Sequence, residues 1–363
     1  MRVALVGLGN AGYTLHLPAL SGIPDATVVG ACDVDTARRD RAAGRWKVPV
    51  FDDFGAMLQT ATPEVVVVGT PPDTHADYCV RAFRAGAHVI CEKPFVPTLA
   101  EADRVLAAAA GAGRSIAFNH EFREMPIFRA IRGEIERIGR DDLVFAQIWQ
   151  LMDLPPWAEP GWRGQLLQRT LHEAGVHLVD LLLAMFGEQP EAVQAAISTG
   201  GLREEQTDAV ALVTLHFSRG RLAQIVQNRL CKGDWQYFEV RADTARASLR
   251  ASFGGRARLS AGLCRSVKPH LRFECGTSGM AWREEGTRRT VLARNGKDPG
   301  IVATREIIAR SLVAFRDGTR PPVDGAEARR VLEVIAACYE SAATGRRVAL
   351  DGSEAATLNA MTL

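Results

Sequence analysis

Two short segments of the sequence carry side chains whose types and spacing suit proton transfer. In the first, CEKP, an apolar strand pattern ends at Cys91 and is followed at once by Glu92, Lys93 and Pro94. Proline restricts the residue before it, which fixes the direction of Lys93. A lysine, whose ordinary pKa is about 10.4, needs a cationic neighbour or desolvation to act as a base near neutral pH. For a lone Glu–Lys pair, a surface salt bridge is the commoner explanation.

The second segment, TLHEAGVHLVDLLLAMFG at residues 170–187, places an imidazole among carboxylates. From residue 173 onward almost every position is apolar except Glu173, His177 and Asp180. At 100° per residue these side chains fall within about 60° of one another and form one polar stripe on an apolar helix. Burying the stripe without partners would cost several kcal/mol, so it must face partners or a cavity. A lone buried histidine is more often a core residue, but His177 has carboxylates at i−4 (Glu173) and i+3 (Asp180), so we interpret it as an oriented acid–base group.

A glycine turn near the N-terminus indicates a nucleotide site. The stretch VGLGNAG at residues 6–12 has the spacing G-x-G-x-x-G, follows a strand pattern and precedes a helix pattern. Glycines let the backbone approach a pyrophosphate, and the helix N-terminus offers unbonded N–H groups and a partial positive charge. This context is that of a dinucleotide-binding turn. We expect binding through Gly7, Gly9, Asn10, Ala11 and Gly12.

Asp33 sets the expected cofactor. It ends the second strand pattern about 20 residues beyond the turn, where a carboxylate accepts hydrogen bonds from the adenosine ribose. A carboxylate there repels a 2′-phosphate, so we predict NAD, with NADP possible. Arg38 and Arg39 could soften this preference, although a solvated helix face explains them as well.

Ligands of an open α/β sheet bind beyond the carboxyl ends of its strands. Lys93 follows such an end, and near a nicotinamide its ammonium could hydrogen-bond the reacting oxygen or move its proton. A positioned group of this kind contributes about 10²- to 10⁴-fold to a rate. We expect the cofactor crevice to be lined by Thr70, Pro71, His75, Glu92 and Lys93.

The strand and helix patterns divide the chain into two domains. We predict a dinucleotide-binding Rossmann domain over residues 1–121, an α/β fold with a doubly wound parallel sheet, because strand and helix signals alternate there. Residues 122–363 predict an α+β domain with an open, mostly antiparallel sheet for substrate binding and oligomerisation. Strands are expected at 2–6, 27–32, 65–70, 88–91, 115–119, 143–150, 209–217, 222–230 and 236–243, and helices at 35–45, 74–85, from 98, 173–186 and 325–343.

Composition excludes several function classes. The 44 basic and 42 acidic residues give a formal net charge of +2, which offers no reason to expect nucleic acid or a membrane surface as a partner. The N-terminal apolar run enters a glycine turn instead of a cleavage site, and no apolar run approaches about 18 residues. Seven cysteines without a C-x-x-C pair are typical of reduced thiols, so we expect a cytoplasmic protein and no metal site.

With these motifs the sequence resembles the Gfo/Idh/MocA oxidoreductase family, which includes glucose–fructose oxidoreductase and inositol 2-dehydrogenase. The resemblance covers nearly the whole chain, through VGLGNAG, VPVFDDFGAML, GTPPDTH, CEKP, GVHLVDLLLAMFG and the segment 321–350. It implies a Rossmann domain, an open mixed sheet and an active site between them. It assigns Lys93 to the substrate hydroxyl and His177 to proton transfer. Hydride would then pass between nicotinamide C4 and a carbon of a sugar, a cyclic polyol or a sugar derivative.

The chain departs from the family pattern on the substrate side. Glu173 stands where members commonly have Asp, and GQLLQRTLHE at residues 164–173 lacks the glycine run that often precedes that acid. Asn119 is expected either at the nicotinamide or the substrate, or as a turn residue at the domain boundary. Trp162 and Arg163, with Trp157, could give a stacking wall and an anion contact, or only aromatic packing.

Three functions stay open at this level. The first is NAD(P)-dependent oxidation or reduction of a sugar or polyol. The second is an NAD-dependent glycosidase that oxidises, eliminates and re-reduces, and the third is a non-catalytic nucleotide sensor. Retention of Lys93 and His177 argues against the sensor. The open face of the second sheet predicts a homodimer or homotetramer.

Overall fold

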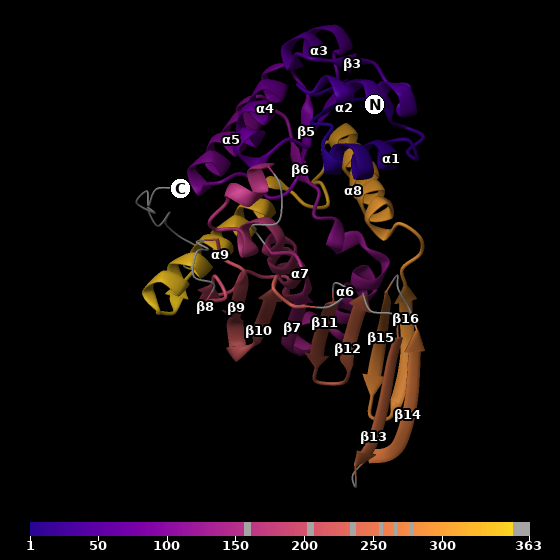
Figure 1. The fold of residues 1–363 in the computed structure, drawn as a ribbon, viewed down its shortest axis with the longest axis vertical. Coiled ribbons are helices and arrows are strands. Elements are labelled where there is room, and N and C mark those ends of the chain that lie inside the picture. The colour runs from indigo at the N-terminus through magenta and orange to yellow at the C-terminus, as the bar shows by residue number, and fades with distance from the viewer. Residues whose placement is uncertain are drawn as a thin grey trace. The chain divides into compact units, whose positions relative to one another are not determined.

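The structure, a computed structural model, describes residues 1–155, 161–201, 207–232, 237–253, 257–264, 267–275 and 279–350, and of residues 257–264, 267–275 and Gln165 it describes only the backbone. The chain forms two compact units. The first comprises Met1–Met125 and Asp298–Glu333, and the second comprises Pro126–Lys297 and the chain from Val334 onward. Each unit contains one large sheet (Figure 1).

The sheet of the first unit is wholly parallel. Its strand order is β3-β2-β1-β4-β5-β6, which is the order of a dinucleotide-binding sheet. The order reverses between β1 and β4, and this is where such sheets bind their ligands. The predicted strands are confirmed, and the added strand β3 is only two residues long. The strands are β1 (Arg2–Val6), β2 (Thr27–Cys32), β3 (Val50–Phe51), β4 (Val65–Val68), β5 (His88–Cys91) and β6 (Ile116–Phe118).

Helices cover both faces of this sheet and bury two separate apolar cores. Helices α3, α4 and α5 lie on one side of the sheet and α1, α2 and α8 on the other (Figure 1), and the buried side chains of each group form a separate cluster with the strands. Thr98 caps α5 by accepting from Glu101 N, so this helix begins where the sequence predicts, near residue 98. The helices are α1 (Leu17–Leu20), α2 (Thr36–Trp46), α3 (Phe54–Ala61), α4 (Pro72–Arg84), α5 (Leu99–Gly111) and α8 (Pro299–Asp317), with short helical turns η1 (Gly12–His16) and η2 (Glu121–Glu124).

Helix α8 lies in the range assigned from sequence to the second domain, but it packs in the first unit. Ile308, Leu312 and Phe315 are buried in the same core as β1. The Phe315 ring also stacks on His88 with ring centroids 4.7 Å apart. The sequence did not predict this helix, because Pro299 and Gly300 open it with residues typical of turns.

The second unit is built on a nine-stranded sheet in which most neighbours are antiparallel, and β7 and β10 are parallel. This confirms the predicted α+β class. The order is β16-β15-β12-β11-β7-β10-β9-β8-β17, and β13 and β14 form a separate hairpin. The strands are β7 (Leu143–Leu151), β8 (Ala192–Ser198), β9 (Val210–His216), β10 (Leu222–Asn228), β11 (Tyr237–Thr244), β12 (Ser248–Phe253), β13 (Ala257–Cys264), β14 (Val267–Cys275), β15 (Met280–Glu285), β16 (Arg288–Arg294) and β17 (Val348–Ala349).

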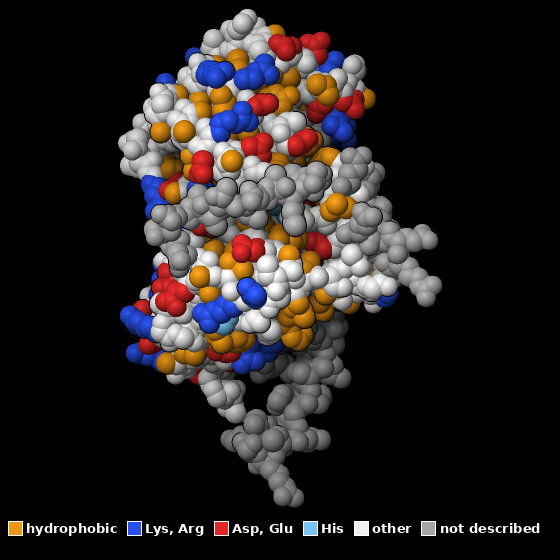
Figure 2. Space-filling model, turned by 90° about the vertical axis from the view of Figure 1, so that its left-hand side faces the viewer, with side chains coloured by type: hydrophobic (Ala, Val, Ile, Leu, Met, Phe, Trp, Pro, Cys, Tyr) orange, Lys and Arg blue, Asp and Glu red, His pale blue; other side chains and the backbone are white. Residues whose placement is uncertain are grey.

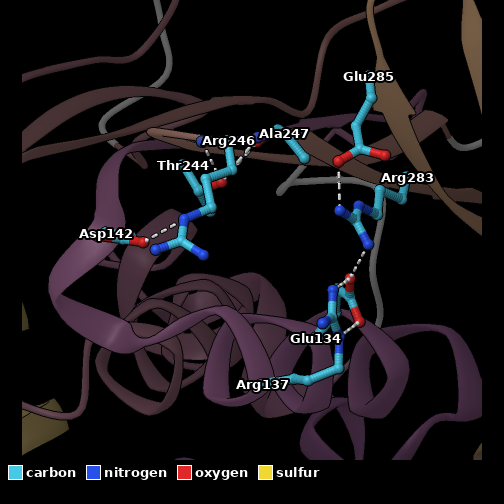
Figure 3. A network of polar contacts seen from close by, with 8 residues as sticks. All are labelled: Glu134, Arg137, Asp142, Thr244, Arg246, Ala247, Arg283 and Glu285. Carbon is cyan, nitrogen blue, oxygen red and sulfur yellow. Dashed lines mark hydrogen bonds and ion pairs between the residues drawn. The ribbon is translucent and has the colours of Figure 1, made fainter.

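Helices α6 (Pro126–Ile138) and α7 (Val176–Phe186) pack against one face of this sheet (Figure 1). Phe128 of α6 meets Phe238 of β11 with ring centroids 5.4 Å apart. Figure 3 shows Arg283 of β15 lying between Glu134 of α6 and Glu285 of its own strand, and Arg283 Nη1 is 3.0 Å from Glu134 Oε1. The sequence did not predict α6. Helix α9 (Gly325–Thr344) begins in the first unit and ends in the second.

The opposite face of the second sheet is exposed and partly apolar. Trp149, Val226 and Leu212 stand side by side on β7, β10 and β9. Trp149 is 41% and Leu212 47% exposed, whereas the alternate residues Ile148 and Val213 are buried. This alternation is that of a sheet with one covered face, as the sequence predicts.

Charges of both signs are interspersed on the face of the molecule drawn in Figure 2, in keeping with the near-neutral net charge. Among the described residues, no helix combines the length and apolar character that a membrane span requires. Cys32, Cys79 and Cys91 are buried free thiols. Burial, followed by the charges of Asp33 and Asp53, raises the pKa of Cys32 to about 11, so this thiol stays protonated near neutral pH.

Candidate cofactor and substrate sites

In the glycine turn of the first unit, Gly7 and Gly12 lie against backbone atoms, whereas Gly9 has open space beside it. A Cβ atom on Gly7, whose φ is +92°, would lie 2.6 Å from the Gly69 carbonyl carbon. A Cβ on Gly12 would lie 1.9 Å from the Gly7 oxygen. A Cβ on Gly9 would meet only Arg38 Nη1, at 4.0 Å. The open space over Gly9 is where a pyrophosphate must come close to the backbone, so the turn fits a dinucleotide.

The helix after the turn begins in an unusual way. Asn10 and Ala11 open its first turn, and residues Gly12–His16 form a π-helical turn before α1. The Tyr13 amide donates to the Gly9 oxygen at 3.0 Å. Such π turns occur frequently at functional sites. Here the turn ends at His16, which is fully buried and whose Nε2 lies 2.7 Å from Glu92 Oε1.

Asp33 is fixed against the same turn. Its Oδ2 accepts from the Leu8 amide at 2.7 Å, and its Oδ1 accepts from the Asp35 amide at 2.9 Å. Arg38 Nη1 lies 3.5 Å from Oδ2. Each carboxylate oxygen retains acceptor capacity, so the side chain can also receive ribose hydroxyls.

The residues after β4 support the loop that contains Lys93. His75 is fully buried, its Nε2 lies 2.8 Å from the Thr70 oxygen, and its Nδ1 lies 2.9 Å from the Phe95 oxygen. Burial lowers the pKa of His75 in spite of these carbonyl contacts. The imidazole therefore joins Thr70, which follows β4, to the backbone at Phe95, two residues after Lys93.

Glu92 is the centre of a buried polar cluster beside Lys93. Glu92 Oε1 lies 2.7 Å from His16 Nε2 and accepts from Asn119 Nδ2 at 2.7 Å. Its Oε2 accepts from the Lys93 amide at 3.1 Å, and Asn119 Nδ2 also reaches Thr304 Oγ1 of α8 at 3.3 Å. Burial alone would raise the pKa of Glu92, but the hydrogen bond and charge of His16, with the Lys93 charge, lower it to about 2. Glu92 is therefore an ionised group inside the first unit.

Sequence reasoning missed His16, although the residue stands four positions after Gly12. No local pattern distinguishes it from a core histidine. Its partner Glu92 lies 76 residues later, so only the folded sheet brings the two together.

In the second unit, His177 and Glu173 lie on consecutive turns of different type. Residues Thr170–Gly175 form a π-helical turn, η6, which leads into α7. The 100° spacing used for the polar stripe therefore applies only from Val176 onward. Glu173, His177 and Asp180 are all buried. The polar stripe therefore faces the interior of the protein and not solvent.

Three arginines surround the Glu173 carboxylate. Arg163 Nε donates to Oε1 at 3.2 Å, and Arg229 Nη1 donates to Oε2 at 3.2 Å. Arg169 Nε is 3.8 Å from Oε2. The guanidinium of Arg163 also lies over the Trp162 ring, with its Cζ 4.5 Å from the centroid. Trp157, the other predicted stacking residue, lies outside the described residues.

A second carboxylate, Asp208, anchors the backbone of this cluster. Its Oδ1 accepts from the Arg169 and Thr170 amides, and its Oδ2 accepts from Tyr339 Oη at 2.6 Å. Burial, followed by the charge of Arg229, lowers the pKa of Arg169 to about 10, whereas Glu173 and Asp208 act in the opposite direction. Sequence reasoning missed Arg169, Arg229 and Asp208, because they come from separate segments with no shared local pattern.

The predicted site residues thus form two groups. The turn with Asp33 and the loop with Lys93, Glu92 and Asn119 belong to the first unit, and Glu173, His177, Arg163 and Trp162 belong to the second. The meeting of Lys93 and His177 at one substrate stays a prediction.

Two family models match the chain. Residues 1–120 match the model described as an oxidoreductase family with an NAD-binding Rossmann fold, and residues 134–248 match the Gfo/Idh/MocA C-terminal domain. These matches confirm the family resemblance and the NAD-binding character of the first domain.

Curated relatives cover the chain to different extents. The 1,5-anhydro-D-fructose reductase of Ensifer adhaerens is 32% identical over 171 residues, which are 44% of this chain and about half (49%) of that protein. The D-apiose dehydrogenase of Paraburkholderia graminis is 26% identical over 369 residues, covering 97% of this chain and 90% of that protein.

Among solved structures, an oxidoreductase from Agrobacterium radiobacter in complex with NAD⁺, L-tartaric acid and magnesium superposes with a TM-score of 0.80. The two chains are 16% identical, and the match covers 96% of this chain and 98% of that one. At this identity the match shows a shared fold.

Proposed function

Because the chain belongs to the Gfo/Idh/MocA family of NAD-binding oxidoreductases, we propose that it transfers hydride between nicotinamide and a hydroxyl-bearing or keto carbon of a sugar, cyclic polyol or sugar derivative. The observation that carries this proposal is the edge of the first sheet. The open glycine turn after β1, Asp33 after β2 and Lys93 after β5 all follow carboxyl ends of parallel strands. The relatives named as a reductase and a dehydrogenase of sugars support the substrate class.

The chain's own residues divide the work. Asp33 and the glycine turn hold the adenosine ribose and the pyrophosphate. Lys93 hydrogen-bonds the substrate oxygen, and His177 exchanges the proton that this oxygen loses or gains. Bound NAD supplies a nicotinamide ring that accepts or returns hydride. Acid–base assistance of this kind contributes about 10²- to 10⁴-fold to the rate.

Two buried groups would keep Lys93 in place. The ionised Glu92 accepts from the Lys93 amide, and His75 binds the Phe95 carbonyl beyond it. His16 and Asn119 hold Glu92 in turn. We assign these four residues as positioning residues, because none of them needs to touch the reacting atoms for this effect.

The test is a change of Lys93 to Ala. Hydride transfer should be lost, while the dissociation constant for NADH, measured by nucleotide fluorescence, should stay within about threefold, because Lys93 acts on the substrate. A panel of polyols, sugars and sugar nucleotides, followed by absorbance at 340 nm with NAD, identifies the substrate first. Lys47, which lies beyond the end of α2, gives the matched Lys47→Ala control. If Lys93→Ala abolished NADH binding, the residue would hold the cofactor or the fold instead.

The other two functions are not favoured. Relatives named as reductase and dehydrogenase support net oxidation or reduction over a glycosidase with no net change in NADH. A nucleotide sensor would not need the ionised Glu92 next to Lys93.

We further propose that a second copy of the chain covers the exposed face around Trp149 and Leu212, giving a homodimer or homotetramer. The cytoplasm is the proposed location, because the described cysteines are free thiols, as expected in a reducing compartment.

A further inference from the structure

The cluster around Glu173 contains more guanidinium than carboxylate charge. Arg163, Arg169 and Arg229 approach Glu173, and Asp208 is the second acid of the group. The side chains of Arg169 and Arg229 are almost fully buried, at 0% and 1% exposure. Charged groups buried in this way must be matched by opposite charge. Glu173 therefore has several guanidinium partners, and Arg163 is the most exposed of the three.

Arg163 is the member of the cluster that reaches solvent. Its side chain is 33% exposed, its Nε is bound to Glu173, and its Cζ lies over the Trp162 ring. Among the described residues, neither of its terminal nitrogens has an acceptor. A guanidinium held through Nε presents its two terminal N–H₂ groups as a fork, which matches the oxygens of a carboxylate or phosphate.

Arg163 is bound to the segment that contains His177, the predicted proton carrier. Glu173, which fixes Arg163, is four residues before His177, and both belong to the continuous η6–α7 segment of the second unit. An anion bound at Arg163 would thus be placed by the same helix that places His177. Trp162 adds an aromatic surface on which a sugar ring can pack.

We propose that Arg163 recognises an anionic oxygen group of the substrate, so that the substrate is an acidic sugar derivative bearing a carboxylate or phosphate. This inference rests on the sugar oxidoreductase function proposed above. In it, Glu173 is the residue that orients Arg163 and offsets part of the charge of the buried arginines.

The test compares ligands that differ only in charge. Glucose, glucuronate and glucose 1-phosphate are titrated calorimetrically into the NADH-loaded protein, in which an alcohol substrate cannot turn over. We expect an anionic sugar to bind about 10- to 100-fold more tightly than glucose, the effect of one or two charge-assisted hydrogen bonds. The affinity should fall with added salt. The stronger of the two anionic ligands identifies the group as carboxylate or phosphate.

Arg163→Gln should bring the affinity ratio of anionic to neutral sugar close to one, and Arg163→Lys should keep part of it. Arg219→Gln is the matched control, because Arg219 is 65% exposed and pairs only with the exposed Asp141 among the described residues. The control should keep the wild-type ratio. If Arg163→Gln does not fold, Arg163→Lys and the salt dependence still decide the question.

Equal binding of neutral and anionic sugars by the wild type would overturn the inference, as would an unchanged ratio in Arg163→Gln. Turnover of neutral sugars at 340 nm without any anion preference would refute the anionic substrate and leave the proposed function intact. Absence of NADH binding would instead refute the proposed function.

Discussion

The buried charge of Glu92 makes a specific prediction about stability and pH. Its carboxylate accepts from Asn119 and the Lys93 amide and pairs with His16, and its pKa falls from its ordinary 4.5 to about 2. A group whose pKa is lower in the folded state stabilises that state when it is ionised. A fall of this size corresponds to about 3 kcal/mol of unfolding free energy.

The pH window follows from the direction of the shift. The stabilisation is fully present above about pH 4.5, where the carboxyl is ionised in both states, and it is lost as the pH falls toward about 2. Glu92→Gln keeps the shape and an acceptor oxygen but removes the charge. At pH 7 the variant should therefore be about 3 kcal/mol less stable than the wild type, and the difference should shrink steadily below pH 4.5.

Urea unfolding followed by circular dichroism between pH 3 and pH 7 measures this difference. Asp77→Asn is the matched carboxylate-to-amide control in the same unit, because Asp77 is 74% exposed and pairs with Arg104 on the surface. The control should change the stability by less than about 0.5 kcal/mol at any pH. A Glu92→Gln effect that is equally large at pH 3 and pH 7 would refute the reasoning, because it would come from packing and not from charge.

Three further predictions test the cofactor turn and the exposed sheet. Asp33→Ser should raise the ratio of catalytic efficiency with NADP to that with NAD by at least about tenfold, because a carboxylate repels the 2′-phosphate; an unchanged ratio would contradict the placement of Asp33 at the ribose. Gly9→Ala should weaken NADH binding, measured by fluorescence, at least about tenfold with little loss of thermal stability, because its Cβ would enter only the open space beside the turn. Gly12→Ala should instead unfold the first unit, because its Cβ would collide with the Gly7 backbone. Trp149→Glu on the exposed face, beside Val226, should lower the molar mass measured by light scattering to that of a monomer, and an unchanged mass would place the interface elsewhere.

Much of the first unit could be predicted because its signals are local. Runs such as VVVV at residues 65–68 are buried on both faces, and the structure confirms them as parallel strands. The spacing of the glycine turn and of Asp33 requires no knowledge of the remaining fold. Helix α6 has a local signal of the same kind, because Ile127, Phe128, Ile131 and Ile135 recur with helical spacing and are all buried.

The second unit shows where local reasoning ends. The apolar character of residues 176–186 predicts helix α7, but the π-helical turn before it changes the angle between Glu173 and His177. A pattern of residue types does not distinguish a π turn from an α turn. A local pattern also cannot predict the partners of Glu173, because Arg163 lies 10 residues before it and Arg229 lies 56 residues after it.

The sequence by itself determined the class of each sheet, the glycine turn with its acid and the position of Lys93 after a strand, because each depends on neighbours within a few residues. Only the tertiary structure decided that α8 completes the first unit, that His16 pairs with Glu92 and that three arginines meet one carboxylate. These contacts join segments far apart in the chain. Their free energy comes from burial and charge in the folded protein, so no local pattern encodes them.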